Sequence, residues 1–284
     1  MFSRGFAGSK IVSLTNSVLY KKRLLKDVLE GNVFPAIRND EMHFYCNGGR
    51  IFSFDNSFKT HIKYASILRH CGGSYILEEN LSKIKVIDNF IDYYERIKEN
   101  CSLYAGIEAS GVYKLLRKNS YAALNATDII VLDIEISFSS KDMENSQDRI
   151  DLLLFDRKSS TLKFIEVKHF SNNELWSREG TKPKVIDQIK TYENQIQRSQ
   201  SEIISAYIEY VKIANELFGA SIKLPEYLEL SVPLLIFGFD RDQLKGRFQR
   251  LLRDDGSLES INYYAIGNID DINLNTVWEK TKKL

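Results

Sequence analysis

The stretch RIDLLLFDRKSSTLKFIEVKH, residues 149–169, is the starting point for interpreting this chain. It contains two apolar runs, 149–155 and 162–169, separated by a short polar segment. This pattern predicts two strands joined as a hairpin. Because side chains alternate between the faces of a strand, Glu166 and Lys168 share one face. Asp151 lies among leucines, where a carboxylate is costly to bury unless it is paired or binds a cation.

Two carboxylates and one lysine on neighbouring strands indicate a particular chemistry. Adjacent strands lie about 5 Å apart, so Asp151 and Glu166 can converge on one metal ion. Hard cations such as Mg²⁺ or Mn²⁺ prefer carboxylate and water oxygens. A bound metal activates its water and stabilises charge on a phosphate. Lys168 can orient or deprotonate that water, or stabilise the developing charge. These residue types predict metal-dependent hydrolysis of phosphodiesters.

The same residues resemble the PD-(D/E)xK nuclease superfamily. The resemblance rests on RID at 149–151 and EVK at 166–168, with 15 positions from acid to acid. Ile150 replaces the proline of the family name, a departure that is frequent in this superfamily. Downstream, Gln188 and Tyr192 fit the QxxxY pattern of the RecB-like and CRISPR-adaptation branches. The resemblance implies that these two side chains face the active site and contact substrate.

A third feature is an acidic residue on an upstream helix. Glu108 is followed at i+4, i+7 and i+8 by Val112, Leu115 and Leu116, which places it on or beside the apolar stripe of that helix. Since the first helix of the superfamily often sends an acid into the metal site, the resemblance implies Glu108 as a further metal ligand. The alternative is a first-turn acid favoured by the helix dipole. The resemblance covers about residues 103–239.

The rest of the chain predicts the fold class, α/β with a mixed central sheet flanked by helices. The resemblance implies a restriction-endonuclease-like core in the order αβββαβ. The predicted helices and strands are 107–118 (helix), 129–138, 149–155 and 162–169 (strands), 184–198 and 202–217 (helices), 233–239 (strand), 242–252 (helix) and 261–266 (strand). Residues 102–284 are expected to form the nuclease-like domain. Residues 1–101 are expected to form an α+β extension for substrate choice or dimerisation.

The N-terminal extension contains predicted helices over 18–31, 58–70 and 81–100, and a hairpin over 41–54 that turns at Asn47-Gly48. Four residues on the second helix, Lys59, His61, Lys63 and Tyr64, form a basic and aromatic cluster. Such a cluster can contact phosphate or stack a base; the alternative is a solvated helix face. In the other domain, the segment 171–184 is expected to be a loop near the active site.

The amino-acid composition bears on the partner, the cysteine chemistry and the cellular compartment of the protein. With 39 basic and 38 acidic residues the net charge is +1, so charge alone decides little about a nucleic-acid partner. Three scattered cysteines argue against a disulfide framework, a zinc site or a four-cysteine iron–sulfur cluster, and favour a reducing, cytoplasmic compartment. No long apolar run indicates a membrane span. We therefore expect a nuclease acting on DNA. A non-catalytic nucleic-acid-binding module and a partner-binding subunit stay open as alternatives, as does a homodimer.

Overall fold

A computed structural model of the chain describes residues 2–66, 73–83, 87–124, 127–138, 149–177, 182–249 and 258–281. The chain divides into two compact units. The N-terminal unit comprises residues 3–126 and 206–222. The C-terminal unit comprises residues 1–2, 127–205 and 223–284.

This division differs from the predicted boundary after residue 101. Residues 102–126 cluster with the N-terminal unit, and so does the second part of helix α6 (Gln200–Phe218). Aromatic packing is the cause, because the rings of Tyr121 and Tyr210 lie 5.6 Å apart and both hydroxyls donate to the carbonyl of Pro35. These contacts join segments far apart in the sequence, so no local pattern reveals them.

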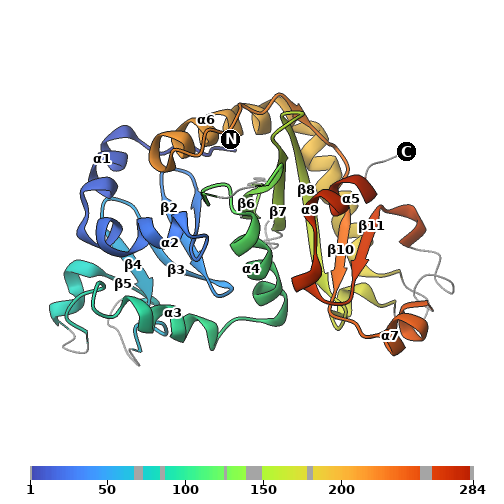
Figure 1. Cartoon of the computed structure of the whole chain (residues 1–284), viewed down its shortest axis with the longest axis horizontal. Helices are drawn as coiled ribbons and strands as arrows, with labels where there is room; N and C mark the ends of the chain where they lie inside the picture. The colour runs from blue at the N-terminus through green and yellow to red at the C-terminus, as the bar shows by residue number, and fades with distance from the viewer. Residues whose placement is uncertain are drawn as a thin grey trace. The chain divides into compact units, whose positions relative to one another are not determined.

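Over its described residues, the N-terminal unit contains a five-stranded antiparallel sheet in the order β1-β2-β3-β4-β5 (Figure 1). Its strands are β1 (Phe34–Ile37), β2 (Met42–Cys46), β3 (Gly49–Phe54), β4 (Phe58–His61) and β5 (Tyr75–Leu77). The predicted hairpin is confirmed as β2 and β3. Asn47 and Gly48 have φ angles of 49° and 80°, the left-handed conformation that such a turn requires.

The helix predicted over residues 58–70 is wrong. Residues 58–61 form β4, which pairs with β3 and β5. Phe58 and Thr60 are buried and alternate with half-buried neighbours, and the Thr60 hydroxyl donates to the carbonyl of Ile51 at 2.6 Å. Packing on one face of a sheet has therefore overridden the local preference. Residues 67–72, with Cys71 and the end of the predicted helix, lie outside the described part of the chain.

The helical segments of this unit are α1 (Gly8–Asn16), a π-helical segment (Tyr20–Leu24), α2 (Leu25–Leu29), the 3₁₀ segment Glu78–Lys83, α3 (Tyr94–Ser102) and α4 (Ile107–Asn119). Two predictions are confirmed: helix α4, and helical structure that stops at Gly31, whose φ is 75°. The helix predicted over 81–100 is wrong in extent, because the α-helix begins only at Tyr94. Residues 84–86 of that prediction lie outside the described residues.

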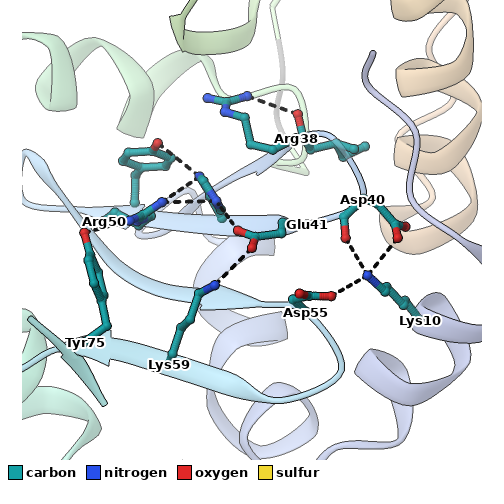
Figure 2. Close-up of polar contacts among 11 residues, drawn as sticks. Lys10, Arg38, Asp40, Glu41, Arg50, Asp55, Lys59 and Tyr75 are labelled. Atoms are coloured by element: carbon teal, nitrogen blue, oxygen red, sulfur yellow. Dashed lines mark hydrogen bonds and ion pairs between the residues drawn. The ribbon is translucent and has the colours of Figure 1, made fainter. Parts of the chain in front are cut away.

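Two lysines beside this sheet form ion pairs with carboxylates. Figure 2 shows Lys10 between Asp40 and Asp55, with its ammonium 2.8 Å from the Asp40 carboxylate. The same view shows Lys59 reaching Glu41 at 3.0 Å. In both pairs the charge of the lysine is compensated by a carboxylate.

The C-terminal unit contains a six-stranded mixed sheet over its described residues, with the path β11-β10-β8-β7-β6 and β9 paired to β8 (Figure 1). Its strands are β6 (Ile129–Ile136), β7 (Ile150–Asp156), β8 (Thr161–His169), β9 (Tyr227–Leu228), β10 (Leu234–Phe237) and β11 (Tyr263–Ile266). The three strands β6, β7 and β8 are antiparallel, whereas β9 and β10 run parallel to β8. Strand β8 is buried along seven of its nine residues, as expected for a central strand.

The helices of this unit include α5 (Lys184–Arg198), the first part of α6, α7 (Arg241–Lys245) and α9 (Leu274–Lys280). Helix α5 has the predicted bounds, and residues 250–252 of the helix predicted over 242–252 lie outside the described residues. The chain is thus a mixed α/β protein with an antiparallel and a mixed sheet flanked by helices. No helix within the described ranges is both long and apolar enough to span a bilayer.

Candidate active site

The register of β7 and β8 places the two predicted acids on one face of the sheet. Leu152 pairs with Ile165, and Leu153 pairs with Phe164. Directly opposite residues of an antiparallel pair share a face. One step further along this register, Asp151 is opposite Glu166, and Lys168 follows two residues later on the same face.

The pairing of β7 with β8 begins at Leu152 and Ile165, next to Asp151. Beyond this point a side chain, and not the backbone of β7, accepts a hydrogen bond from β8. The Oδ2 atom of Asp151 accepts it from the backbone N–H of Val167 at 2.8 Å. On the opposite edge β8 pairs with β10 from Glu166 to His169. Glu166 and Lys168 therefore lie in the part of β8 that pairs with β10, just beyond the part that pairs with β7.

Lys168 lies between two carboxylates. Its ammonium group is 2.8 Å from Oε1 of Glu166 and 2.8 Å from Oε2 of Glu174. The Lys168 and Glu166 side chains are almost fully buried, at 9% and 1% exposed, whereas that of Glu174 is 42% exposed. The ion pair therefore has a buried partner on the sheet and a solvated partner on a loop.

Glu174 is the site residue that the sequence analysis missed. It lies in a 3₁₀ turn (Asn173–Leu175), inside the segment predicted as a loop near the active site. The side chain of Asn172 accepts a hydrogen bond from the backbone N–H of Glu174 at 2.8 Å and so caps this turn. Asn-Asn-Glu directly after a strand is a detectable capping signal, but it does not tell where the carboxylate points. Residues 178–181 of the loop lie outside the described part of the chain.

The electrostatics of the site follow from burial and from the closeness of its charges. Burial, and then the charge of Glu166, raise the pKa of Asp151 well above its usual range. Burial alone would lower the pKa of Lys168, but the charge and hydrogen bond of Glu166 together with Glu174 hold it above its ordinary value. The charge of Glu166 thus opposes the ionisation of Asp151, and a bound cation would relieve this repulsion.

Helix α5 supports the first strand of the site. The side-chain amide of Gln188 donates to the hydroxyl of Tyr192 at 2.8 Å, and that hydroxyl donates to the backbone carbonyl of Arg149 at 3.2 Å. Tyr192 is 1% exposed. Gln188 and Tyr192 thus form one chain of hydrogen bonds that ends two residues before Asp151. The structure places them as supports of β7, and their predicted contact with substrate stays a prediction.

Two further acids, Glu108 and Glu135, lie on elements other than β7 and β8. Glu108 is on α4 and belongs to the N-terminal unit, so its role as a metal ligand also stays a prediction. Glu135 on β6 has a φ of 50° and its carboxylate lies 3.2 Å from the guanidinium of Arg149. The charge of Glu135 contributes to the raised pKa of Asp151, which places it within electrostatic reach of the site.

The side chains of the site can be compared with the ligands that a divalent metal ion requires. Among the residues that the structure describes, no group of three His, Cys, Asp or Glu side chains is arranged to hold an ion. The sheet supplies two carboxylates, Asp151 and Glu166. Mg²⁺ keeps several waters and is commonly bound by one or two carboxylates together with substrate phosphates. These two acids therefore fit a partly hydrated Mg²⁺ or Mn²⁺, and not a metal that needs a complete protein cage.

Comparisons with known proteins give no family for this chain. No protein-family model matches it, and no curated protein and no solved structure is significantly similar to it. The function must therefore be argued from the geometry of the site.

Proposed function

We propose that this chain is a metal-dependent nuclease with a restriction-endonuclease-like core, which hydrolyses phosphodiester bonds in DNA. One observation supports it most strongly: Asp151, Glu166 and Lys168 share one face of the sheet at the point where the pairing of β7 and β8 begins. Along the chain, α4, β6, β7, β8 and α5 follow the order that the resemblance implies, and α6 and β9 come between α5 and the last strand of that order, β10. DNA as substrate and a cytoplasmic location belong to the same proposal.

Asp151 and Glu166 would hold Mg²⁺ or Mn²⁺. When bound, the ion would supply an activated water and charge stabilisation at the phosphate. The carboxylate of Asp151 is oriented by the Val167 N–H, and that of Glu166 by the ammonium of Lys168. Rigid strands thus fix both carboxylates before substrate arrives, which lowers the entropic cost of reaching the reactive geometry.

The state of Lys168 selects between its two chemical roles. Its ammonium lies 2.8 Å from Glu166 and 2.8 Å from Glu174, and both ion pairs favour the protonated form of the side chain. A protonated amine cannot accept a proton from water, so Lys168 acts in this proposal as a charge that stabilises the developing phosphate oxyanion. Glu174, which is partly exposed, keeps the ammonium in place from the solvent side.

A second candidate function is a non-catalytic nucleic-acid-binding module. The observation that favours it is the same ion pair, because a lysine between two carboxylates also forms a self-contained structural network. Such a network perturbs pKa values without any catalytic use. The two candidates differ in whether a divalent metal binds and whether phosphodiesters are cut.

The test is cleavage of linear, circular and single-stranded DNA by purified protein with Mg²⁺ or Mn²⁺, and with EDTA as the metal-free control. Asp151→Asn and Lys168→Ala are compared with Asp128→Asn and Lys158→Ala, an exposed ion pair of the same unit with a separation of 2.8 Å. Thermal melts check that each variant folds, and calorimetry measures Mn²⁺ binding.

We expect metal-dependent cleavage that falls by roughly 100-fold or more in the two site variants, as for removal of a transition-state donor. The surface pair should retain wild-type cleavage, and Asp151→Asn should weaken Mn²⁺ binding. Equal cleavage by wild type, Asp151→Asn and Lys168→Ala would refute the assignment of the site. DNA binding without cleavage and without Mn²⁺ binding would favour the second candidate.

A further inference from the structure

The N-terminal unit contains a surface pocket that the proposed nuclease site does not use. It has a volume of about 500 Å³, which is within the range of pockets for small ligands. Its walls come from the end of β4 and the turn after it, with His61 and Lys63, and from the end of α3, with Asn100, Leu103 and Tyr104. Two of the four residues of the predicted basic and aromatic cluster, His61 and Lys63, line the pocket from a strand and a turn, and a third, Tyr64, is buried next to them in the chain.

The pocket is held together by contacts between these two segments. The side-chain amide of Asn100 donates both to the carbonyl of Tyr64 and to the hydroxyl of Ser66, each at 2.7 Å. The ring of Tyr64 lies 6.1 Å from that of Tyr104. The walls are thus tied to each other, which reduces the ordering cost of binding a ligand.

An exposed aromatic ring forms one wall. Tyr104 is 56% exposed and its neighbour Leu103 is 77% exposed, which is unusual for large apolar side chains. The ammonium of Lys63 lies 4.9 Å from the ring centre of Tyr104 and 5.0 Å from that of Tyr64. A positive charge therefore lies beside the ring of a largely exposed tyrosine, at cation–π distance.

The charge of Lys63 is not compensated by a carboxylate, in contrast to three other lysines of the unit. Lys10, Lys59 and Lys98 each lie within ion-pair distance of a carboxylate. Within the described ranges, Lys63 has no carboxylate at that distance, and no described residue that lines the pocket is acidic. The pocket consequently favours an anion.

A second cation lies close by. The guanidinium of Arg50 is 5.1 Å from the ring centre of Tyr75 and donates to its hydroxyl at 2.7 Å (Figure 2). The ring of Tyr75 in turn lies 5.2 Å from that of His61. Burial first, and then the charges of Lys63 and Arg50, lower the pKa of His61.

We propose that this pocket binds one nucleotide of a single-stranded nucleic acid, with its base stacked on Tyr104 and its phosphate beside Lys63. A flat apolar ring next to an uncompensated cation matches the two parts of a nucleotide. A duplex cannot use the pocket in this way, because its bases are already stacked on each other. The choice of nucleic acid as the ligand rests on the proposed function, but the residues of the pocket are separate from the nuclease site.

The test is binding of a fluorescently labelled oligothymidylate of 12 nucleotides to the full-length protein in EDTA, followed by polarisation. Without metal no cleavage occurs, so this measurement is independent of the nuclease activity. The variants are Tyr104→Ala, Tyr104→Phe and Lys63→Ala. The matched controls are Tyr227→Ala, whose side chain is similarly exposed at 60%, and Lys223→Ala, both in the C-terminal unit. A second arm measures displacement of the probe by thymidine monophosphate.

We expect Tyr104→Ala to weaken binding by roughly 5- to 140-fold, the loss of one stacked base, and Tyr104→Phe to bind like wild type. Lys63→Ala should reduce the slope of log affinity against log salt by about 0.7, the value for one phosphate contact on a single strand. Unchanged binding by Tyr104→Ala and Lys63→Ala, or equal losses in the control variants, would overturn the proposal. A mononucleotide that binds as tightly as the oligonucleotide would overturn the assignment to a strand.

Discussion

His43 should make the stability of the N-terminal unit depend on pH, and the size of the effect can be worked out. The side chain is 10% exposed, and its Nε2 lies 2.9 Å from the Glu41 carboxylate and 3.1 Å from the Arg50 guanidinium. Burial lowers the pKa of His43 from 6.5 to about 4, and Arg50 and Arg38 oppose its charge while Glu41 acts in the other direction. The folded unit therefore contains neutral His43 at neutral pH.

The sign follows from which state binds the proton first. As pH falls through 6.5 the unfolded chain gains a proton at this position and the folded unit does not, so the free energy of unfolding decreases until the folded pKa of about 4 is reached. The whole shift corresponds to about 3 kcal/mol, and the part lost between pH 7.5 and 5 is about 2 kcal/mol. Glu41, whose hydrogen bond from His43 and pairing with Lys59 lower its pKa to about 2, loses its contribution only below this window.

The assay is hydrogen–deuterium exchange of peptides from β2 and β3 at pH 7.5 and 5, corrected for the intrinsic exchange rate. Tryptophan fluorescence is unsuitable, because Trp176 and Trp278 both belong to the C-terminal unit. His43→Gln removes this titratable group, so the change in its opening free energy between the two pH values should be about 2 kcal/mol smaller than that of wild type, and the remaining change includes the contribution of His61, whose pKa is also lowered. His169→Gln, in the other unit, is the control and should keep the wild-type dependence. Equal pH dependence of wild type and His43→Gln would refute this reasoning.

Two further predictions concern the candidate active site. Tyr192→Phe removes the hydroxyl that donates to the Arg149 carbonyl, so we expect the free energy of unfolding in urea to fall by about 1 kcal/mol and cleavage to fall several-fold; unaltered cleavage would show that this helix does not position β7. Glu174→Gln removes the solvent-side partner of Lys168. Because Glu174 is partly exposed, stability should change by less than about 1 kcal/mol, whereas kcat should fall several-fold with little change in KM; an unchanged kcat would contradict the positioning role.

Features that depend on neighbours in the sequence were predicted well. Asn47-Gly48 requires positive φ angles wherever it occurs, so the hairpin of β2 and β3 was predictable. The spacing of Asp151, Glu166 and Lys168 likewise puts them on one face once two strands pair in this register. The i, i+4 spacing of Gln188 and Tyr192 explains why their side chains meet.

Features that depend on distant segments were missed. Residues 58–61 became a strand because β3 offers a partner edge, which no pattern within the segment encodes. Glu174 reaches Lys168 only because the chain reverses after β8. The end of α6 joins the N-terminal unit because Tyr210 packs on Tyr121, a contact between residues far apart in the chain.

The sequence by itself therefore determined the strand periodicity, the turn chemistry and the set of acids and lysine that indicates metal-dependent hydrolysis. These follow from backbone geometry and local side-chain chemistry. Only the tertiary structure decided that Asp151 caps the beginning of the β7–β8 pairing, that Glu174 completes the environment of Lys168, and that Lys63 and Tyr104 line one pocket. The physical reason is that pairing edges and packed faces are chosen by competition among all segments, so they are properties of the whole folded chain.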